Sequence, residues 1–456
     1  MVVSEHKGDW WLPDKPEIKV KGTLVISDDQ AVLELAGALT EIGPGKPQDF
    51  RPEVILGISI EGHRITLLKC FQFNPTVNLG TGAKMSNFFA EMVLIGEHFN
   101  SVDELRFNVI YAEFPSLNNW VRISGFDIQR PDPTVTTVTY KRPTPIQAQV
   151  NGVRVSLVFE GLPHWEFPKQ VTIKQRTSIE IKPHDAKSLD EFLKLVRDIQ
   201  NFLSLAIAQE TRPVKIYGET EKHKMQIKDQ MVYPPIRIIV PSWFSSKGSK
   251  SPQNPLLSFK DIVNRFGLIL KNWFTNADPL EPVYGGYFAV IYNPQMYLHQ
   301  KFLSFLNALE SYHRRRFSNY ELPEVDHKKR KDAIVSAVPE HYRNWLEKKL
   351  EYSNELTLRV RLQDLVQKFS FLQFRDTDWF VNKVLNTRNY LTHYDPSKKE
   401  GAATNDELLE ITHKLKVLIE TVLLTELGLS PTEVQNLVRQ SDEYQLAFVR
   451  LQPSRS

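Results

Sequence analysis

The spacing of the hydrophobic residues changes near Tyr292, and this change constrains the fold more than any single motif. Before it, short segments such as residues 19–35 and 54–71 alternate apolar and polar side chains, the pattern of half-buried β-strands. After it, apolar residues recur every three or four positions, the pattern of amphipathic helices. A chain of 456 residues also exceeds one ordinary domain. We therefore predict an α+β protein with a large β-rich N-terminal domain, residues 1–290, followed by an all-α helical bundle, residues 291–456.

Within the first domain, prolines and glycines separate the strand-like segments, which favours a sandwich or a strongly bent sheet. Glu61 and Gly62 lie between two alternating segments and predict a hairpin turn. One helix interrupts the strands. Ser188 and Glu191 have the spacing of a capping box, and apolar residues follow at helical spacing over residues 189–207. The N-terminal domain is thus expected to be mainly, but not purely, β.

Composition excludes several classes of protein and site. The net charge of +3 is close to neutral for this length, so any nucleic-acid-binding surface must be local. The single cysteine, Cys70, rules out an intramolecular disulfide and a cysteine-based zinc cluster, and its apolar neighbours predict that it is buried. The sequence has no His-Glu-x-x-His motif and no glycine-rich nucleotide-binding loop, so no metal or cofactor is predicted. It also has no apolar signal core and no apolar run long enough for a membrane span, so we expect a cytoplasmic protein.

One short motif in the helical part combines residues suited to cutting RNA: Arg388, directly followed by Asn389, and then His393. The helix that carries them is expected to begin near Asp376 and to end close to His393, because Pro396 disfavours helix in the residue before it. Arginine binds phosphate oxygens through a planar fork, and histidine can take and give a proton near neutral pH. Together they could promote attack of a 2′-hydroxyl on the adjacent phosphate. The structural alternative is a surface arginine and a histidine that stabilises the helix C-terminus.

The spacing of this motif also limits how it could work. Five residues turn an ideal helix by about 500°, so the side chains of Arg388 and His393 would project about 140° apart. Either the helix breaks between them, or a second subunit supplies half of a composite site, as two-fold pairing of the same helix would do. The second option predicts a homodimer or a higher homo-oligomer.

The motif Arg388-Asn389-x-x-x-His393, the helical tail around it and the upstream helical segment 309–314 resemble the HEPN ribonuclease domain. The large β-rich region before them resembles the layout of ApeA-like bacterial antiphage proteins. This resemblance implies that Arg388 and His393 are the catalytic pair and that Asn389 is a supporting polar residue. It also matches Glu310 to an acidic residue on an earlier helix of the family.

The resemblance further implies metal-independent endoribonuclease activity, dimerisation through the HEPN helices and a role in abortive infection. In this reading His393 is the general base or general acid, Arg388 stabilises the charge on the phosphate, and the products carry 2′,3′-cyclic phosphate and 5′-hydroxyl ends. The expected partners are RNA, with tRNA as one candidate, and a phage-derived trigger. Basic residues that we predict to contact RNA, although basic runs are often only solvated helix starts, are Arg314, Arg315, Lys328, Lys329 and Arg330.

A non-catalytic recognition protein is the alternative, in which a β-sandwich module binds a ligand and the helical tail only dimerises. Two aromatic groups, Trp10-Trp11 and Trp165-Glu166-Phe167, could line a groove in such a module, although packing in or at the edge of a sheet is their expected use. A carbohydrate-active domain is not favoured, since no pair of carboxylates can be placed on facing strands. His313 lies beside the apolar stripe of its helix, and we expect it to be hydrogen-bonded and partly buried rather than catalytic.

Overall fold

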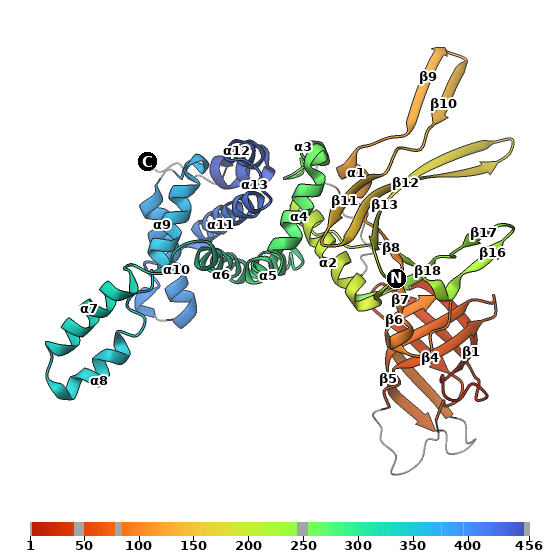
Figure 1. Ribbon diagram of the computed structural model, residues 1–456, viewed down its shortest axis with the longest axis horizontal. Coiled ribbons are helices and arrows are strands. Elements are labelled where there is room, and N and C mark those ends of the chain that lie inside the picture. Colours follow the sequence, from red (N-terminus) through yellow and green to blue (C-terminus); the bar gives the residue numbers. More distant parts are fainter. Residues whose placement is uncertain are drawn as a thin grey trace. The chain divides into compact units, whose positions relative to one another are not determined.

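The computed structural model describes residues 2–40, 50–77, 84–243, 254–374, 376–394 and 396–450. It contains two compact units: Met1–Gln253 with Ser258–Lys271, and Asn254–Leu257 with Asn272–Ser456. The first unit is β-rich and the second is helical, as the change in hydrophobic spacing predicted (Figure 1). The units divide within α4 (Phe266–Asn276), and the helix after it, α5 (Glu281–Ile291), packs against α6. The division therefore comes earlier than the predicted boundary after residue 290, where the change in hydrophobic spacing becomes visible.

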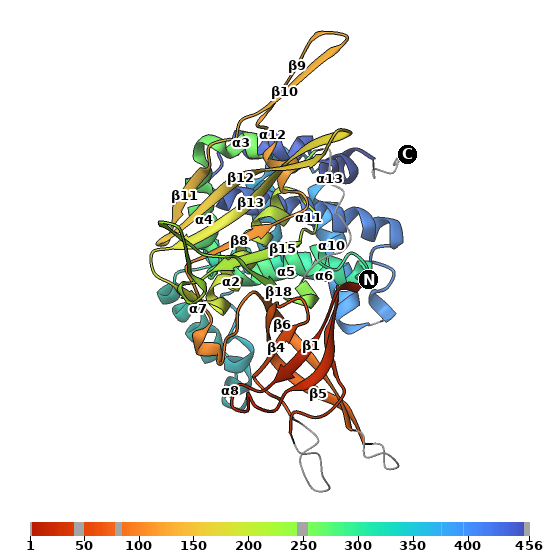
Figure 2. The same cartoon turned by 90° about the vertical axis from the view of Figure 1, so that its right-hand side faces the viewer.

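Six antiparallel strands of the first unit pair in a closed ring, which we call the closed sheet (Figure 2). β1 pairs with both β2 and β4, while β6 pairs with both β3 and β5, so each of the six strands has two neighbours in the ring. The strands are β1 (Val2–Trp11), β2 (Val20–Ser27), β3 (Ala31–Leu35), β4 (Val54–Ser59), β5 (Arg64–Val77) and β6 (Lys84–Ile95). Of the two forms expected, the strongly bent sheet is the one observed, and the predicted turn at Glu61-Gly62 joins β4 to β5.

The inside of the closed sheet is apolar. Alternate residues of each strand point inward, and those that form the core include Trp10, Leu24, Leu33 and Ile65. The predicted packing role of Trp10-Trp11 is therefore confirmed, since both indoles are buried. Cys70 also lies in this core, as predicted, and burial raises the pKa of its thiol.

A second group of six antiparallel strands forms an open sheet that continues from the closed one (Figure 2). The first half of β6 pairs with β3, whereas its last residues pair with β18, so β6 belongs to both sheets. In spatial order the strands of the open sheet are β18 (Ile236–Ile239), β15 (Lys215–Glu219), β8 (Val109–Glu113), β13 (Gln170–Pro183), β12 (Val153–Glu166) and β11 (Ile146–Val150). The helices of this unit are α1 (Leu117–Val121), α2 (Leu189–Ala206), α3 (Phe259–Ile262) and the first part of α4. The predicted capping box of Ser188 and Glu191 starts α2.

Three short two-stranded pairs accompany the two sheets: β7 (Arg106–Phe107) with β14 (Lys187–Ser188), β9 (Phe126–Asp132) with β10 (Val135–Tyr140), and β16 (Met225–Ile227) with β17 (Gln230–Val232). Of these, β9–β10 and β16–β17 extend from the unit (Figure 1). The long hairpin β12–β13 runs far beyond β8, which pairs only with residues 179–181 of β13. Trp165 and Phe167 lie at its tip, where their side chains are 67% and 94% exposed. The expectation that these two aromatic residues pack in or against the sheet is therefore wrong, because the tip extends past the neighbouring strands.

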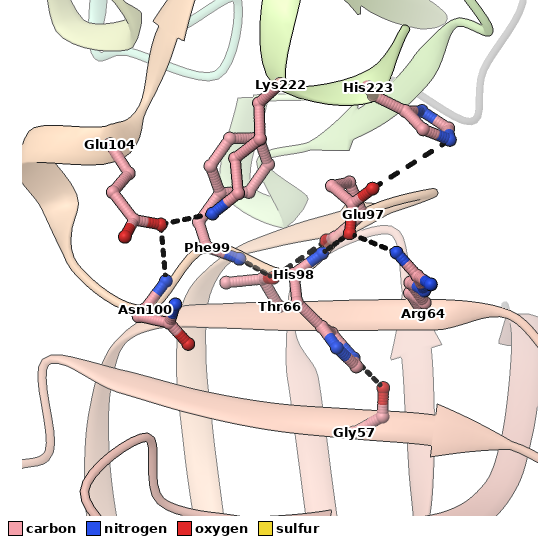
Figure 3. Close-up of polar contacts among 10 residues, drawn as sticks. All are labelled: Gly57, Arg64, Thr66, Glu97, His98, Phe99, Asn100, Glu104, Lys222 and His223. Atoms are coloured by element: carbon pink, nitrogen blue, oxygen red, sulfur yellow. Dashed lines mark hydrogen bonds and ion pairs between the residues drawn. The ribbon is translucent and has the colours of Figure 1, made fainter. Parts of the chain in front are cut away.

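A polar cluster fixes the junction at which the chain leaves β6 (Figure 3). Arg64 Nη1 and the backbone N–H of His98 each donate to Glu97 Oε1 at 2.8 Å, and His223 Nε2 lies 4.0 Å from Glu97 Oε2. The Thr66 hydroxyl donates to the Glu97 carbonyl at 2.9 Å. Burial alone would raise the pKa of the Glu97 carboxyl, but these donors lower it, so the carboxylate stays ionised. The cluster ties the start of β5 to the segment that follows β6.

The second unit is a bundle of helices packed around α11, which is buried on nearly every side. Its helices after α4 are α5, α6 (Leu298–Arg316), α7 (Glu324–Ser336), α8 (Glu340–Lys349), α9 (Leu358–Lys368), α10 (Thr377–His393), α11 (Asn405–Glu426), α12 (Pro431–Gln440) and α13 (Asp442–Gln445). Helices α7 and α8 form a hairpin that projects from the bundle, and most of their residues are exposed (Figure 1). None of the described helices is both long enough and apolar enough to cross a membrane.

The interior of this bundle contains charged side chains. Lys416 of α11 lies between two carboxylates, 3.6 Å from Glu420 and in an ion pair with Glu443, which also contacts His413. The Tyr287 hydroxyl donates to Glu420 at 2.9 Å. Burial raises the pKa of Glu420 to about 7. Burial also opposes ionisation of Glu443, but Lys416 and His413 outweigh it and lower the pKa of that carboxyl to about 2.

Candidate active site

Helix α10 carries the arginine and the histidine predicted to be catalytic. It begins after Asp376, whose carboxylate accepts the Trp379 N–H at 2.8 Å, and its buried face includes Phe380 and Val384. It ends at His393 because Tyr394 adopts a left-handed conformation with φ of 49°. The limits of this helix agree with those predicted from the capping residues and from the proline that follows.

Arg388 and Asn389 lie half-buried on the last turns of α10. Arg388 Nη1 donates to Asn389 Oδ1 at 3.3 Å, so the two side chains are in direct contact. The hydroxyl of Thr392 donates to the Arg388 carbonyl at 2.7 Å, one turn earlier on the same helix. Asn389 is thus placed to restrict the orientation of the Arg388 guanidinium.

His393 is the last residue of α10, and its side chain is exposed. Within the described part of the chain, which omits Asp395, its imidazole has no hydrogen-bond or ion-pair partner. The helix continues unbroken from Arg388 to His393, so the alternative in which it breaks between them is wrong. Along one continuous helix the two side chains project about 140° apart. Among the described residues, no hydrogen bond joins Arg388 to His393.

Glu310, the tentative acidic residue, lies on α6 and faces another arginine. Arg314 Nη2 is 3.1 Å from Glu310, and Arg314 Nη1 is 2.8 Å from Glu355. The hydrogen bonds to Glu355 and Glu310 raise the pKa of the Arg314 guanidinium. Among the described residues, no hydrogen bond or ion pair connects Glu310 to Arg388 or His393. The structure therefore groups Glu310 with Arg314 and not with the motif on α10.

The neighbouring His313 is fully buried, and it is hydrogen-bonded as predicted. Its Nε2 lies 3.0 Å from Asp364, and its Nδ1 lies 3.2 Å from Arg361. Burial lowers the pKa of this imidazole, which favours the neutral form. The buried Arg361 also donates to Asn319 at 2.7 Å. Sequence reasoning missed Arg361, although it occupies the same helical stripe as the buried Leu362 and Leu365.

The basic residues predicted to contact RNA differ in their surroundings. In the part of the chain that the structure describes, Arg315 and Lys328 are exposed and form no ion pair. Lys329 lies 3.8 Å from Asp326, and Arg330 lies 3.1 Å from Glu321. Arg314 is held by its two carboxylates. Two of the five cations are therefore directly available to a polyanion, and the other three would have to exchange partners.

Comparison with protein families assigns both units. Residues 5–273 match the family model described as ApeA N-terminal domain 1, which is more than half of the 456-residue chain. The chain belongs to the ApeA family. Residues 303–433 match the model described as Apea-like HEPN, and this range contains Glu310, Arg388, Asn389 and His393. No curated protein and no solved structure matches the chain significantly. HEPN domains are generally ribonucleases, so the helical domain is of a nuclease type. The two family matches together place the chain among antiviral defence proteins.

Proposed function

We propose that the chain is a metal-independent endoribonuclease of a bacterial antiphage system that acts by abortive infection. The observation that carries this proposal is the arrangement on α10, within the HEPN match: a half-buried Arg388 in contact with Asn389, followed by an exposed His393 at the helix end. An exposed imidazole at a helix C-terminus can approach a bound substrate. A guanidinium beside an amide oxygen is partly pre-oriented for one.

The chemistry follows from the two side chains. One His393 imidazole takes the proton of the ribose 2′-hydroxyl as O2′ attacks the adjacent phosphorus, and a second imidazole gives a proton to O5′ as the P–O5′ bond breaks. Arg388 binds the non-bridging oxygens and stabilises the charge that accumulates on them. The products are a 2′,3′-cyclic phosphate and a 5′-hydroxyl. DNA lacks the attacking hydroxyl and should not be cut.

Two copies of the chain would complete the site. Because Arg388 and His393 leave opposite sides of one helix, a two-fold axis beside α10 would bring the arginine of each copy towards the histidine of the other. The same pairing would supply one imidazole as base and the other as acid. RNA, with tRNA as one candidate, would then contact the exposed Arg315 and Lys328, and Glu310 would act by holding Arg314.

The direct test is expression of the wild type and of His393→Ala, Arg388→Ala and a control, His341→Ala, which removes an exposed histidine of α8. We expect growth arrest and RNA fragments with cyclic phosphate ends for the wild type and the control. General acid–base catalysis typically contributes about 10²–10⁴-fold, so His393→Ala should reduce cleavage by that factor. Cleavage that survives in His393→Ala refutes the role of His393. Equal behaviour of all four proteins supports the non-catalytic recognition protein instead.

Mixing the two inactive variants tests the shared site. In a dimer of one Arg388→Ala chain and one His393→Ala chain, a site built from both chains retains one intact Arg–His pair but only one of the two imidazoles, so cleavage should recover in part. A site contained within one chain would stay inactive in the same mixture. The mixing experiment therefore separates the dimeric arrangement from the nuclease activity itself.

A further inference from the structure

Three potential metal ligands meet at one end of the closed sheet. His6 comes from β1, whereas Glu61 and His63 come from the turn between β4 and β5. One ligand atom from each of these side chains lies within 4.8 Å of the other two, and the two imidazole rings are 6.1 Å apart in an edge-to-face arrangement. His6 is half-buried, while Glu61 and His63 are exposed. The side chains of Glu61 and His63 are therefore open to solvent.

The pairing of the strands explains why His6 points into the closed sheet. It is opposite Leu24 of β2 and shares a strand face with Trp10, and both of these residues belong to the apolar core. Ser4 lies on the same face of β1 and is opposite Ile26, another core residue. The apolar interior of the closed sheet is thus followed, at this end, by a polar layer that contains Ser4 and His6.

This polar layer contains buried atoms that lack partners. His6 Nε2 and Ser4 Oγ are both inaccessible and have no hydrogen-bond partner among the described residues. A buried polar atom without a partner costs free energy, and native structures usually supply a partner, a water or an ion. His6 Nε2 is therefore a buried nitrogen that still lacks the partner such atoms usually have.

The turn holds the other two ligands in place. The Ser59 N–H donates to the His63 carbonyl at 2.9 Å, and the His63 N–H donates to Ser59 Oγ at 3.2 Å. Gly62 has a φ of +84°, which suits the tight turn. The hydrogen bond from the Ser59 hydroxyl is the main cause of a lowered pKa of the Glu61 carboxyl. Ser59 thus organises both Glu61 and His63.

The charge states suit a cation. A metal ion binds the neutral form of an imidazole through the lone pair of one ring nitrogen. Glu61 contributes a negative charge. Arg237 of β18 lies near enough to act electrostatically on His6, and its positive charge opposes a bound cation, so the carboxylate of Glu61 has to offset it.

His98 differs from His6 and His63 in that its imidazole is hydrogen-bonded. His98 Nε2 lies 2.7 Å from the Gly57 carbonyl, so that nitrogen already has a partner (Figure 3). His6 and His63 form no such bond among the described residues. Two imidazoles and one carboxylate are donors that first-row transition metals prefer, and Zn²⁺ is bound by such three-residue sets with a fourth position open.

We propose that His6, Glu61 and His63 bind one divalent transition-metal ion, with Zn²⁺ as the first candidate, and leave one position open to water or to an anionic donor. Bonds of about 2.0–2.2 Å in a tetrahedral arrangement place neighbouring ligand atoms about 3.4 Å apart. Ligand atoms that lie up to 4.8 Å apart would have to approach by up to about 1.4 Å, which rotation of the exposed Glu61 and His63 side chains can supply. Sequence motifs miss the site because His6 and His63 lie 57 positions apart. The site belongs to the β-rich unit, so it is independent of the RNA chemistry proposed for α10.

The test is equilibrium dialysis of the untagged full chain against Zn²⁺, with metal counted by mass spectrometry and Co²⁺ absorption as a second readout. We expect one Zn²⁺ per wild-type chain and a loss of affinity of about 100-fold or more in His6→Ala, Glu61→Gln and His63→Ala. The matched control is His184→Ala, because His184 is 92% exposed and lies 3.1 Å from the Asp185 carboxylate without forming part of this group. It should bind zinc like the wild type.

Two results would overturn the site: no zinc on the wild type, or equal zinc on the wild type and the three variants. Glu61 and His63 are exposed, so their variants should keep the thermal transition of the wild type and decide the outcome even if His6→Ala does not fold. Loss of zinc together with unchanged RNA cleavage would support the metal site and its independence from α10.

Discussion

The closed sheet and the helical bundle differ in the side chains that fill their interiors: those of the closed sheet are apolar, whereas the bundle also contains charged ones. The core of the closed sheet consists of apolar residues, such as Leu33 and Phe88. The bundle is organised around α11, which buries Glu420 and half-buries Lys416 among its leucines and isoleucines. Removing atoms from an apolar core costs free energy through lost contacts and a cavity, at any pH. Removing one member of a buried ion network costs free energy through unpaired charge, and this cost varies with pH.

The largest expected effect is that of Lys416→Met. This change leaves Glu420 and Glu443 close together without their shared cation. Breaking a buried ion network in this way typically costs about 3–5 kcal/mol in the free energy of unfolding. Urea denaturation at pH 7 and pH 5 measures it, and the loss should be smaller at pH 5, where a carboxyl can hold a proton more easily. A loss that is the same at both pH values would contradict the electrostatic account.

Leu33→Ala tests the apolar core in the same way. Leu33 is fully buried in the closed sheet, so truncation should reduce the free energy of unfolding of the β-rich unit by about 2–5 kcal/mol. Ile128→Ala is a suitable control, because that side chain is 61% exposed and its truncation should change stability by about 0.5 kcal/mol or less. The cost of Leu33→Ala should be equal at pH 5 and pH 7. A marked pH dependence would remove the distinction between the two interiors.

Glu420→Gln isolates one charge of the network while keeping an acceptor for Tyr287. The pKa of Glu420 is raised from 4.5 to about 7, so the folded protein keeps a proton that the unfolded chain releases between these values. The stabilising effect of this proton is present below pH 4.5 and is lost as the pH rises towards 7. It amounts to roughly 2–3 kcal/mol. Denaturation curves between pH 4.5 and 7.5 should show this decline in the wild type and a flatter dependence in the variant.

The smallest effect on stability is expected at the helix starts, where both units use the same device, a capping box. Ser188 Oγ accepts the Glu191 N–H at 3.3 Å, and Glu191 in turn accepts the Ser188 N–H at 3.0 Å. Ser188→Ala should reduce the free energy of unfolding by about 1 kcal/mol, and Ser188→Thr should restore most of it. The bundle has a corresponding box at Thr404 and Glu407, so Thr404→Ala should cost a similar amount. Thermal denaturation checks both changes, and no change in either variant would show that these caps add nothing.

Local features of the sequence were enough to predict much of this fold. The capping box at Ser188, the turn at Glu61-Gly62 and the end of α10 at His393 depend on residues within one or two turns of each other. The closure of the sheet was not predictable in this way, because β1 pairs with β4 and β3 with β6 across more than 40 intervening positions. Strand alternation shows which residues face a core, and it does not show which strand lies alongside.

The two sites differ for the same reason. Arg388, Asn389 and His393 form a motif within one helix, so the sequence shows them as a group. His6 and His63 become neighbours only after β1 pairs with β4, and nothing in the spacing of the histidines indicates this. An amphipathic pattern indicates one buried face, whereas helices on several sides of α11 also bury Glu420 and half-bury Lys416. Packing on several sides of one helix is a property of the whole bundle and cannot be read from the helix alone.

The sharing of β6 between two sheets has a mechanical consequence. Its residues 86–90 pair with β3, and its residues 93–95 pair with β18, so a slip of this strand along its own axis would change the register of both sheets at once. The two sheets should therefore unfold as one cooperative block. An ion or effector that binds to the closed sheet should then slow hydrogen exchange in β18 and β15 of the open sheet as well, without contacting either strand.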